Sequence, residues 1–260
     1  MAISAFKRIE MKFLLNRMQF EALRSRLETH MEPDAYCKNG QFYSIYNVYY
    51  DTKDSRLIRA SLEKPYYKEK LRMRSYASPV SENDKVFLEL KKKTGGIVHK
   101  RRAVMTLKEA NAFLKTGISP AAGTYMNRQV TQEIAYFLRC NDVSPAAYIS
   151  YNRIAFFGKE DKDFRITFDF GITTRREEVA LEKGSYGQSL LPPNRYLMEI
   201  KITGAFPLWL AEALAELKIY KTSFSKYGME YKHHCTGNGH SPHMLPTFPA
   251  LEGQRLCANH

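Results

Sequence analysis

The feature that most constrains the fold of this chain is a set of segments in which arginine and lysine alternate with apolar residues. In a β-strand, side chains two positions apart lie on the same face, so such a segment has one basic face and one apolar face. Lys70, Arg72 and Arg74 alternate in this way with Leu71 and Met73. The pattern recurs along the chain, and it predicts a sheet with an apolar side and a strongly basic side.

The same alternation, together with capping signals, locates the expected elements. Strands are expected at 6–15, 42–51, 68–76, 85–93, 97–105, 147–157, 164–172 and 195–203. Helices are expected after Asn16, after Thr106 with its capping-box partner Glu109, and at 127–139, 207–220 and 223–233. This layout predicts one α+β domain over residues 1–234, followed by an irregular or disordered tail over 235–260.

The basic faces admit two arrangements of the predicted strands. The simpler one is an open antiparallel sheet whose charged face is solvated. A face this rich in arginine repels itself, however, unless an anion lies among the charges. If the eight strands instead close into an antiparallel β-tunnel with the helices packed outside, the bases line an interior that can hold a small ligand. Arginine forks match phosphate oxygens and lysines add point charges, so this interior favours a chain of phosphates.

A few carboxylates stand among these bases. Glu10, Glu89, Asp169 and Glu199 each lie on a strand that carries basic side chains on the same face. Phosphate would repel these carboxylates unless a divalent cation bridges the two kinds of group. Mg²⁺ or Mn²⁺ held by carboxylates and phosphate oxygens is therefore the expected arrangement.

The charge of the whole chain fits the same class of ligand. Its 260 residues carry a formal net charge of +13, which attracts polyanions in general. Nucleic-acid binding is not expected, because the bases alternate with aliphatic residues rather than with exposed aromatic ones. The start of the chain has no apolar signal segment, no stretch is long enough to span a membrane, and the four scattered cysteines suit a reducing compartment. A cytoplasmic location is expected.

Several of these segments together resemble one known family. They are Arg8–Phe13, Tyr49–Thr52, Lys70–Tyr76, Glu89–Lys91, Lys100–Arg102, Tyr151–Arg153, Arg165–Asp169, Glu199–Lys201 and Ser223–Tyr227. In their order and spacing, over about residues 6–234, the chain resembles the VTC domain, the polyphosphate-polymerase branch of the triphosphate tunnel metalloenzyme superfamily. This resemblance implies an eight-stranded antiparallel tunnel, ATP as phosphoryl donor, polyphosphate as acceptor, ADP as the second product, and Mn²⁺ or Mg²⁺ as cofactor.

By position, the resemblance implies a set of site residues in this chain. The phosphate ligands it implies are Lys12, Arg72, Arg74, Lys91, Lys100, Arg153, Arg165 and Lys226. The strand faces add Arg8, Lys70, Arg102 and Lys201. The residues expected to act in catalysis, by stabilising charge on the transferring phosphoryl group, are Lys12, Arg72, Arg74, Lys91, Arg153 and Lys201. The metal is expected on Glu199, with Glu10 as a second ligand.

Two departures from related sequences bear on the activity. The hydrolase and cyclase branches of the superfamily open with E-x-E-x-K, whereas this chain has Arg8 at the first position, which favours the polymerase branch. Fungal members carry a second lysine where this chain has Ser223, so one end of the tunnel is less basic here. The resulting prediction is a metal-dependent polyphosphate polymerase. A tunnel triphosphatase for inorganic or nucleoside triphosphate, and a non-catalytic sensor of polyphosphate or inositol polyphosphate, are the alternatives.

Overall fold

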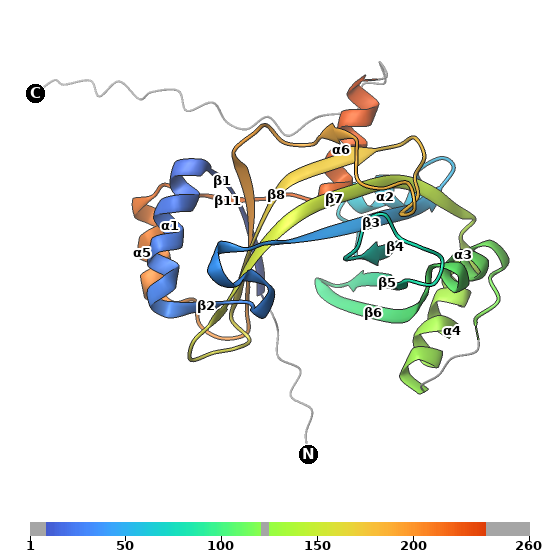
Figure 1. Ribbon diagram of the computed structural model, residues 1–260, viewed down its shortest axis with the longest axis horizontal. Coiled ribbons are helices and arrows are strands. Elements are labelled where there is room, and N and C mark those ends of the chain that lie inside the picture. The colour runs from blue at the N-terminus through green and yellow to red at the C-terminus, as the bar shows by residue number, and fades with distance from the viewer. Residues whose placement is uncertain (1–8, 121–124, 238–260) are drawn as a thin grey trace, which may run out of the picture.

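A computed structural model describes residues 9–120 and 125–237 and contains one large antiparallel sheet flanked by helices (Figure 1). The strands are β1 (Ile9–Asn16), β2 (Met31–Pro33), β3 (Tyr43–Thr52), β4 (Tyr67–Ser75), β5 (Lys85–Thr94), β6 (Ile97–Thr106), β7 (Val143–Gly158), β8 (Arg165–Arg175), β9 (Gln188–Ser189), β10 (Arg195–Ile202) and β11 (Lys221–Thr222). The helices are α1 (Arg17–His30), α2 (Arg56–Leu62), α3 (Leu107–Thr116), α4 (Tyr125–Cys140), α5 (Leu208–Glu216) and α6 (Lys226–Gly237), with a short 3₁₀ helix, η1 (Ala35–Gly40). The predicted α+β class is confirmed.

The strands follow one another in the order β11-β1-β10-β8-β7-β3-β4-β5-β6, with β2 beside β7 and β9 beside β8. Eight of these strands have 8 residues or more, and they are the eight that the sequence predicts. The other three, β2, β9 and β11, have 2 or 3 residues each. A strand of two or three residues is too short to show an alternation of polar and apolar residues, so the sequence does not predict these three strands.

The sheet is open, which corrects the prediction of a complete tunnel. Among the described residues, β6 pairs only with β5 and β11 only with β1, so these two strands are the edges. Both edges are protected from further pairing. β11 offers two residues, and the side chain of Asn127 in α4 bonds both the N–H and the C=O of Val104 on β6. Those bonds occupy a backbone position that an added strand would need.

The register of the strands gathers the charged side chains on one face. In one part of the sheet, Lys12 on β1 lies opposite Glu199 on β10. In another part, Glu89 on β5 lies between Arg72 on β4 and Arg102 on β6. Directly opposite residues in antiparallel strands point to the same side, so the predicted basic segments share a single face, here called the charged face.

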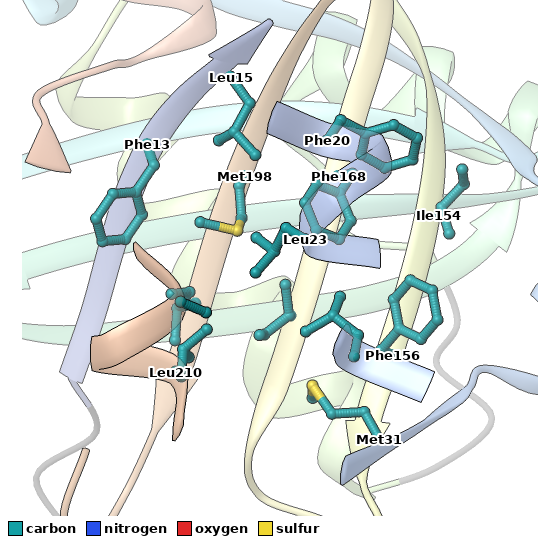
Figure 2. Packing of buried hydrophobic residues seen from close by; sticks show 14 of the residues in the cluster. Phe13, Leu15, Phe20, Leu23, Met31, Ile154, Phe156, Phe168, Met198 and Leu210 are labelled. Atoms are coloured by element: carbon teal, nitrogen blue, oxygen red, sulfur yellow. The ribbon is translucent and has the colours of Figure 1, made fainter. Parts of the chain in front are cut away.

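The opposite face is apolar, and helices cover it in two patches. In one patch, Phe20 and Leu23 of α1 pack against Phe168 of β8 and Met198 of β10 (Figure 2), and α5 adds Leu210. In the second patch, α3 and α4 cover the apolar side of β4, β5 and β6. Each buried Leu or Phe contributes roughly 1.5–3 kcal/mol. The two apolar patches therefore fix which side of the sheet the charged residues point to.

Two helix starts follow the predicted capping signals. Asn16 and Gln19 form a capping box at the start of α1, and Thr106 and Glu109 form one at the start of α3. The helix predicted to begin at Pro207 ends at Glu216, before the predicted end at residue 220.

Helix α6 lies against the charged side of the sheet. Tyr227 of α6 stacks on Tyr49 of β3 with ring centroids 4.8 Å apart, and its hydroxyl donates a hydrogen bond to Asp51. Phe224, just before the helix, is buried in the same cluster. The residues at this end of β3 are therefore shielded by α6.

The end of the chain carries a prediction that the structure leaves open. α6 continues through Gly237, so residues 235–237 of the predicted tail are helical. Residues 238–260 lie outside the described residues, and the domain boundary at residue 234 stays a prediction. In the parts of the chain that the structure describes, none of the helices is both long and apolar enough to cross a membrane.

Candidate functional site

Glu89 is the centre of the largest ionic cluster on the charged face. Its side chain is 1% exposed, and its carboxylate accepts hydrogen bonds from the Nε atoms of Arg72 and Arg102, both at 2.7 Å. Lys100 lies 2.8 Å from the same carboxylate, and Arg74 lies 3.9 Å away. Burial would raise the pKa of Glu89, but Arg72, Arg74 and Lys100 outweigh burial and hold the pKa well below its usual range. Glu89 is ionised and fixes the direction of the surrounding side chains.

Three neutral side chains on β3 and β7 hold the same arginines from the other side. Arg72 donates to the hydroxyl of Tyr49 at 3.1 Å. Arg74, which is 5% exposed, donates to Asn47 at 3.0 Å and to the hydroxyl of Tyr151 at 3.3 Å. Glu89 accepts no hydrogen bond from the N–H groups that make these bonds, so the two arginines are held from two sides.

Asp169 on β8 is the centre of a second cluster. It is fully buried and forms a bidentate pair with Arg153 of β7, with distances of 2.6 and 2.8 Å. Lys226, the first residue of α6, lies 2.5 Å from the same carboxylate. Arg153 and Lys226 overcome the effect of burial and hold the pKa of Asp169 well below its usual range. This cluster attaches the start of α6 to the sheet.

A third group on β1 and β10 contains the two carboxylates predicted to bind metal. Glu199 pairs with Lys201 at 2.5 Å and with Lys12 at 3.6 Å. Lys12 also lies 3.4 Å from Glu10. Burial would raise the pKa of Glu199, but Lys201 and Lys12 lower the pKa to about 2. The carboxylate is ionised at neutral pH, as a metal ligand must be.

The residues of this third group fit a divalent cation that binds together with phosphate. Mg²⁺ typically takes one or two protein carboxylates and completes its shell with water and phosphate oxygens. Glu10 and Glu199 offer that number. Within residues 9–120 and 125–237, no three His, Cys, Asp or Glu side chains are grouped so that they could hold a metal ion by themselves.

A row of lysines crosses three adjacent strands. Lys70 on β4 lies opposite Lys91 on β5, which lies opposite Lys100 on β6. Lys70 and Lys91 form no ion pair with a carboxylate in the described part of the chain, and Lys70 has a hydroxyl neighbour, Ser225 Oγ, at 3.5 Å. Desolvation lowers the pKa of Lys70 to about 8 and that of Lys100 to about 8. Like charges directly opposite one another destabilise a sheet, so this row needs an anion.

The sheet curls so that distant strands share this site. In the sheet order, five strands separate β1 from β5, yet the carboxylates of Glu10 on β1 and Glu199 on β10 act on the pKa of Lys91 on β5. Lys12 of β1 donates to the carbonyl of Phe224 at 3.1 Å, one residue from the Ser225 that Lys70 of β4 approaches. The charged face is therefore the concave side of an open, curved sheet.

Arg165 on β8 lies at the margin of the site. It donates to Asp34 at 3.4 Å and to the hydroxyl of Tyr43 at 3.3 Å, while its buried Nε has no hydrogen-bond partner among the described residues. The buried hydroxyl of Thr167, two residues along the same face, also has none in this part of the chain. Buried polar atoms without a hydrogen-bond partner are rare in a protein core, and a ligand that binds beside them is one explanation.

The structure brings nearly all the predicted site residues to one face. The basic residues that lie on it are Lys12, Lys70, Arg72, Arg74, Lys91, Lys100, Arg102, Arg153, Arg165, Lys201 and Lys226. Arg8 lies outside the described residues. One expectation is corrected: Glu89 and Asp169 do not need a metal, because arginine and lysine side chains already neutralise them.

Sequence reasoning missed the positioning groups of the site. The alternation of the sequence places Glu89 and Asp169 on the charged face, but their role as centres of ionic clusters depends on the residues of neighbouring strands. Asn47 and Tyr49 lie in an aromatic strand that carries no charge pattern. Tyr49 belongs to the segment Tyr49–Thr52 that carries the family resemblance, but only the strand register shows that Asn47 lies opposite Arg74 and Tyr49 opposite Arg72.

Comparisons with known proteins bear on the family and the fold of this chain. The family model of the VTC domain matches residues 7–234. Two similar solved structures are both named as putative adenylate cyclases. The one from Bacillus halodurans is 18% identical, with a TM-score of 0.50, over 84% of this chain and 93% of that chain. The one from Vibrio parahaemolyticus is 11% identical, with a TM-score of 0.42, over 86% of this chain and 97% of that chain.

These comparisons differ in what they support. The likeness to the Bacillus halodurans protein supports the fold alone, because identity is low. No curated protein sequence matches the chain. The family match covers most of the chain and every described strand that carries the charged face. The chain belongs to the VTC domain family, which is associated with polyphosphate handling.

Proposed function

We propose that this protein is a metal-dependent polyphosphate polymerase that transfers the γ-phosphoryl group of ATP to a polyphosphate chain on the concave charged face. The row formed by Lys70, Lys91 and Lys100 is the observation that carries this proposal. Two of its three lysines have no carboxylate partner in the described residues. A phosphate chain that runs across the strands would supply negative charge at each position of the row.

The arginines are suited to hold individual phosphates. Arg72 and Arg102 are aligned by Glu89, and Arg153 by Asp169, so their forks are oriented before a ligand binds. Since side chains fixed in advance lose little entropy on binding, they can favour the in-line arrangement of donor and acceptor. Their charge stabilises the negative charge on the equatorial oxygens of the transferring group, and no side-chain nucleophile is required.

The cation would be held by Glu199 and Glu10. When bound, Mn²⁺ or Mg²⁺ would supply positive charge to offset the negative charge that develops on the phosphate oxygens during transfer. Lys12 contacts both carboxylates, at distances longer than those of a tight ion pair. It is placed to bind a phosphate oxygen next to the cation. Lys201 keeps Glu199 ionised and oriented.

The test is incubation of the purified protein with ATP and Mn²⁺, followed by electrophoresis with a stain for polyphosphate. A ladder of products supports the polymerase. Release of free phosphate alone would mean that water is the acceptor and the protein is a triphosphatase. Binding without turnover would mean a sensor. Glu199→Gln should abolish the metal-dependent product, while Glu212→Gln, a change on the exposed side of α5, should leave it unchanged.

A further inference from the structure

A chain of aromatic rings borders the charged face at one end. Tyr36 of η1 contacts Tyr43 of β3 with ring centroids 6.2 Å apart, and Tyr43 contacts Tyr76 at 6.2 Å. Tyr76 in turn contacts Phe87 of β5 at 5.6 Å. None of the three pairs is stacked face to face, since their planes are inclined by 68°, 57° and 75°. These four residues are called the aromatic rim.

The rim continues the charged face along each strand. Tyr76 is two residues beyond Arg74, and Phe87 is two residues before Glu89, so each is the next side chain on the same side. Two residues along a strand span roughly 7 Å. Tyr43 lies directly opposite Arg153. Two of the rings therefore lie one side-chain step beyond Arg74 and Glu89, and a third lies directly opposite Arg153, so the rim directly adjoins the charged face.

The aromatic residues near the two ends of β3 differ in how far they are exposed to solvent. At the end near α6, Tyr49 is 8% exposed and Tyr227 is 2% exposed. At the rim, Tyr36 is 75% exposed and Tyr76 is 46% exposed. Aromatic rings placed only to close the sheet would bury their area, as the α6 end does. Tyr36 and Tyr76 of the rim instead leave much of their area in contact with solvent.

Cationic groups flank the rim on both sides. The guanidinium carbon of Arg102 lies 4.6 Å from the centroid of Phe87, and Arg165 donates to the hydroxyl of Tyr43. A surface of exposed rings with arginines beside it is suited to stack a planar heterocycle that carries a phosphate tail. Inorganic polyphosphate has no part that could use the rings.

We propose that the aromatic rim stacks the base of a nucleoside triphosphate whose phosphates lie on the charged face. The rim then distinguishes the nucleotide donor from the inorganic chain, since only the nucleotide makes contacts in both places. This inference rests on the proposed function, because it needs the charged face to bind phosphates. It assigns to Tyr36 and Tyr76 a role in nucleotide affinity and none in the affinity for phosphate chains.

The test compares two ligands by isothermal titration calorimetry in EDTA, which prevents metal-dependent turnover. The ligands are ATP and inorganic tripolyphosphate, and the variant is the double substitution Tyr36→Leu and Tyr76→Leu. Stacking on aromatic side chains contributes about 1–3 kcal/mol per base, so the Kd for ATP should rise about tenfold. The Kd for tripolyphosphate should change less than about twofold. Tyr36→Phe with Tyr76→Phe should retain ATP affinity, because stacking uses the ring and not the hydroxyl.

Tyr220→Leu is the matched control, since Tyr220 is 74% exposed and follows α5. It should change neither affinity. The inference is overturned if the double leucine variant loses ATP and tripolyphosphate affinity together, or if it loses neither. If the wild-type protein binds neither ligand in EDTA, nor when the titration is repeated with Mn²⁺, the proposed function itself fails and the inference with it. Tripolyphosphate binding with no effect of the leucine variant overturns the inference alone.

Discussion

The two pairs of carboxylates on the charged face have contrasting surroundings. Glu89 and Asp169 are almost completely buried, and arginine forks contact both, at distances of 2.6–2.8 Å. Glu10 and Glu199 are more exposed, at 34% and 13%, and their partners are the single-point charges of Lys12 and Lys201. A buried carboxylate enclosed by guanidinium groups is already neutralised, and a metal could reach it only by displacing charged partners from a site that is closed to solvent. A carboxylate held by a lysine can exchange that partner for a cation.

The contrast teaches that alternation in the sequence cannot by itself distinguish a structural carboxylate from a metal ligand. All four occupy equivalent places in their strands. What separates them is the number and kind of cations on neighbouring strands, which the register decides. Glu89 and Asp169 hold the arginines in place, whereas Glu10 and Glu199 remain available to bind a cation.

Replacement of Glu89 should have the largest effect on stability. Glu89→Gln keeps the shape of the side chain but leaves Arg72, Arg102 and Lys100 around a neutral group. Removal of one partner from a buried ionic cluster typically costs about 3–5 kcal/mol. The free energy of unfolding, measured by urea titration, should fall by that amount. A loss below about 1 kcal/mol would contradict the structural role of Glu89.

Glu199→Gln should show the opposite balance between stability and activity. Because Glu199 keeps partial contact with solvent, its loss should cost less than about 2 kcal/mol of unfolding free energy. Metal-dependent turnover with ATP should fall at least about 100-fold, which corresponds to about 2.7 kcal/mol of transition-state stabilisation. Turnover is measured by ADP release at saturating Mn²⁺. If Glu89→Gln and Glu199→Gln lost stability and turnover in the same proportion, the distinction between the structural carboxylates and the metal-binding carboxylates would be wrong.

The lysine row offers a variant in which binding and stability should separate. Lys91→Met removes a charge that has no carboxylate partner among the described residues and two lysines opposite it. A hydrogen bond to a charged group is typically worth about 1.5–3 kcal/mol, so the Kd for tripolyphosphate should rise at least about tenfold.

Stability should be unchanged in Lys91→Met, or should rise by a few tenths of a kcal/mol, because the like-charge contact is relieved. Calorimetric titration and urea unfolding measure the two effects on the same sample. Lys115→Met, on the exposed side of α3, is the control. A variant that loses stability as well as affinity would indicate that Lys91 is part of the structural network rather than of the ligand site.

The sequence predicts the face of each long strand correctly, because a period of two forces alternate residues to opposite sides. The basic segment 68–76 and observed β4 differ by one residue at each end. It also predicts the starts of α1 and α3, since a capping box is a local interaction. These features depend only on residues close together in the chain.

What the sequence does not predict depends on distant neighbours. Asp169 binds Lys226, 57 residues further along, and Lys12 approaches Phe224, 212 residues away. The protection of the β6 edge involves the side chain of Asn127 in α4, which bonds the backbone of Val104 from 23 residues further along the chain. The pKa values of the lysines depend on how far the curved sheet removes them from water, which no local pattern encodes.

The smallest predicted effect is the pH dependence of the lysine row. With pKa values of about 8, Lys70 and Lys100 lose their charge between pH 7 and 9, so affinity for tripolyphosphate should fall several-fold over that range. Stability should change in the other direction. Their folded-state pKa values lie below the ordinary value of 10.5, so above pH 8 the unfolded chain binds more protons and these two lysines make unfolding less favourable as the pH rises.

The variant Lys70→Arg with Lys100→Arg isolates this effect, because arginine stays charged across the range. Its affinity for tripolyphosphate should fall less than that of the wild-type protein between pH 7 and 9, as measured by calorimetric titration. The ligand ionises identically in both titrations, so the difference between the two profiles reports the lysines alone. Parallel profiles would show that Lys70 and Lys100 keep their protons through pH 9. The lysines of the row would then be ordinary solvated side chains, like the surface lysines of α3. They would not be charges held close together to bind a phosphate chain.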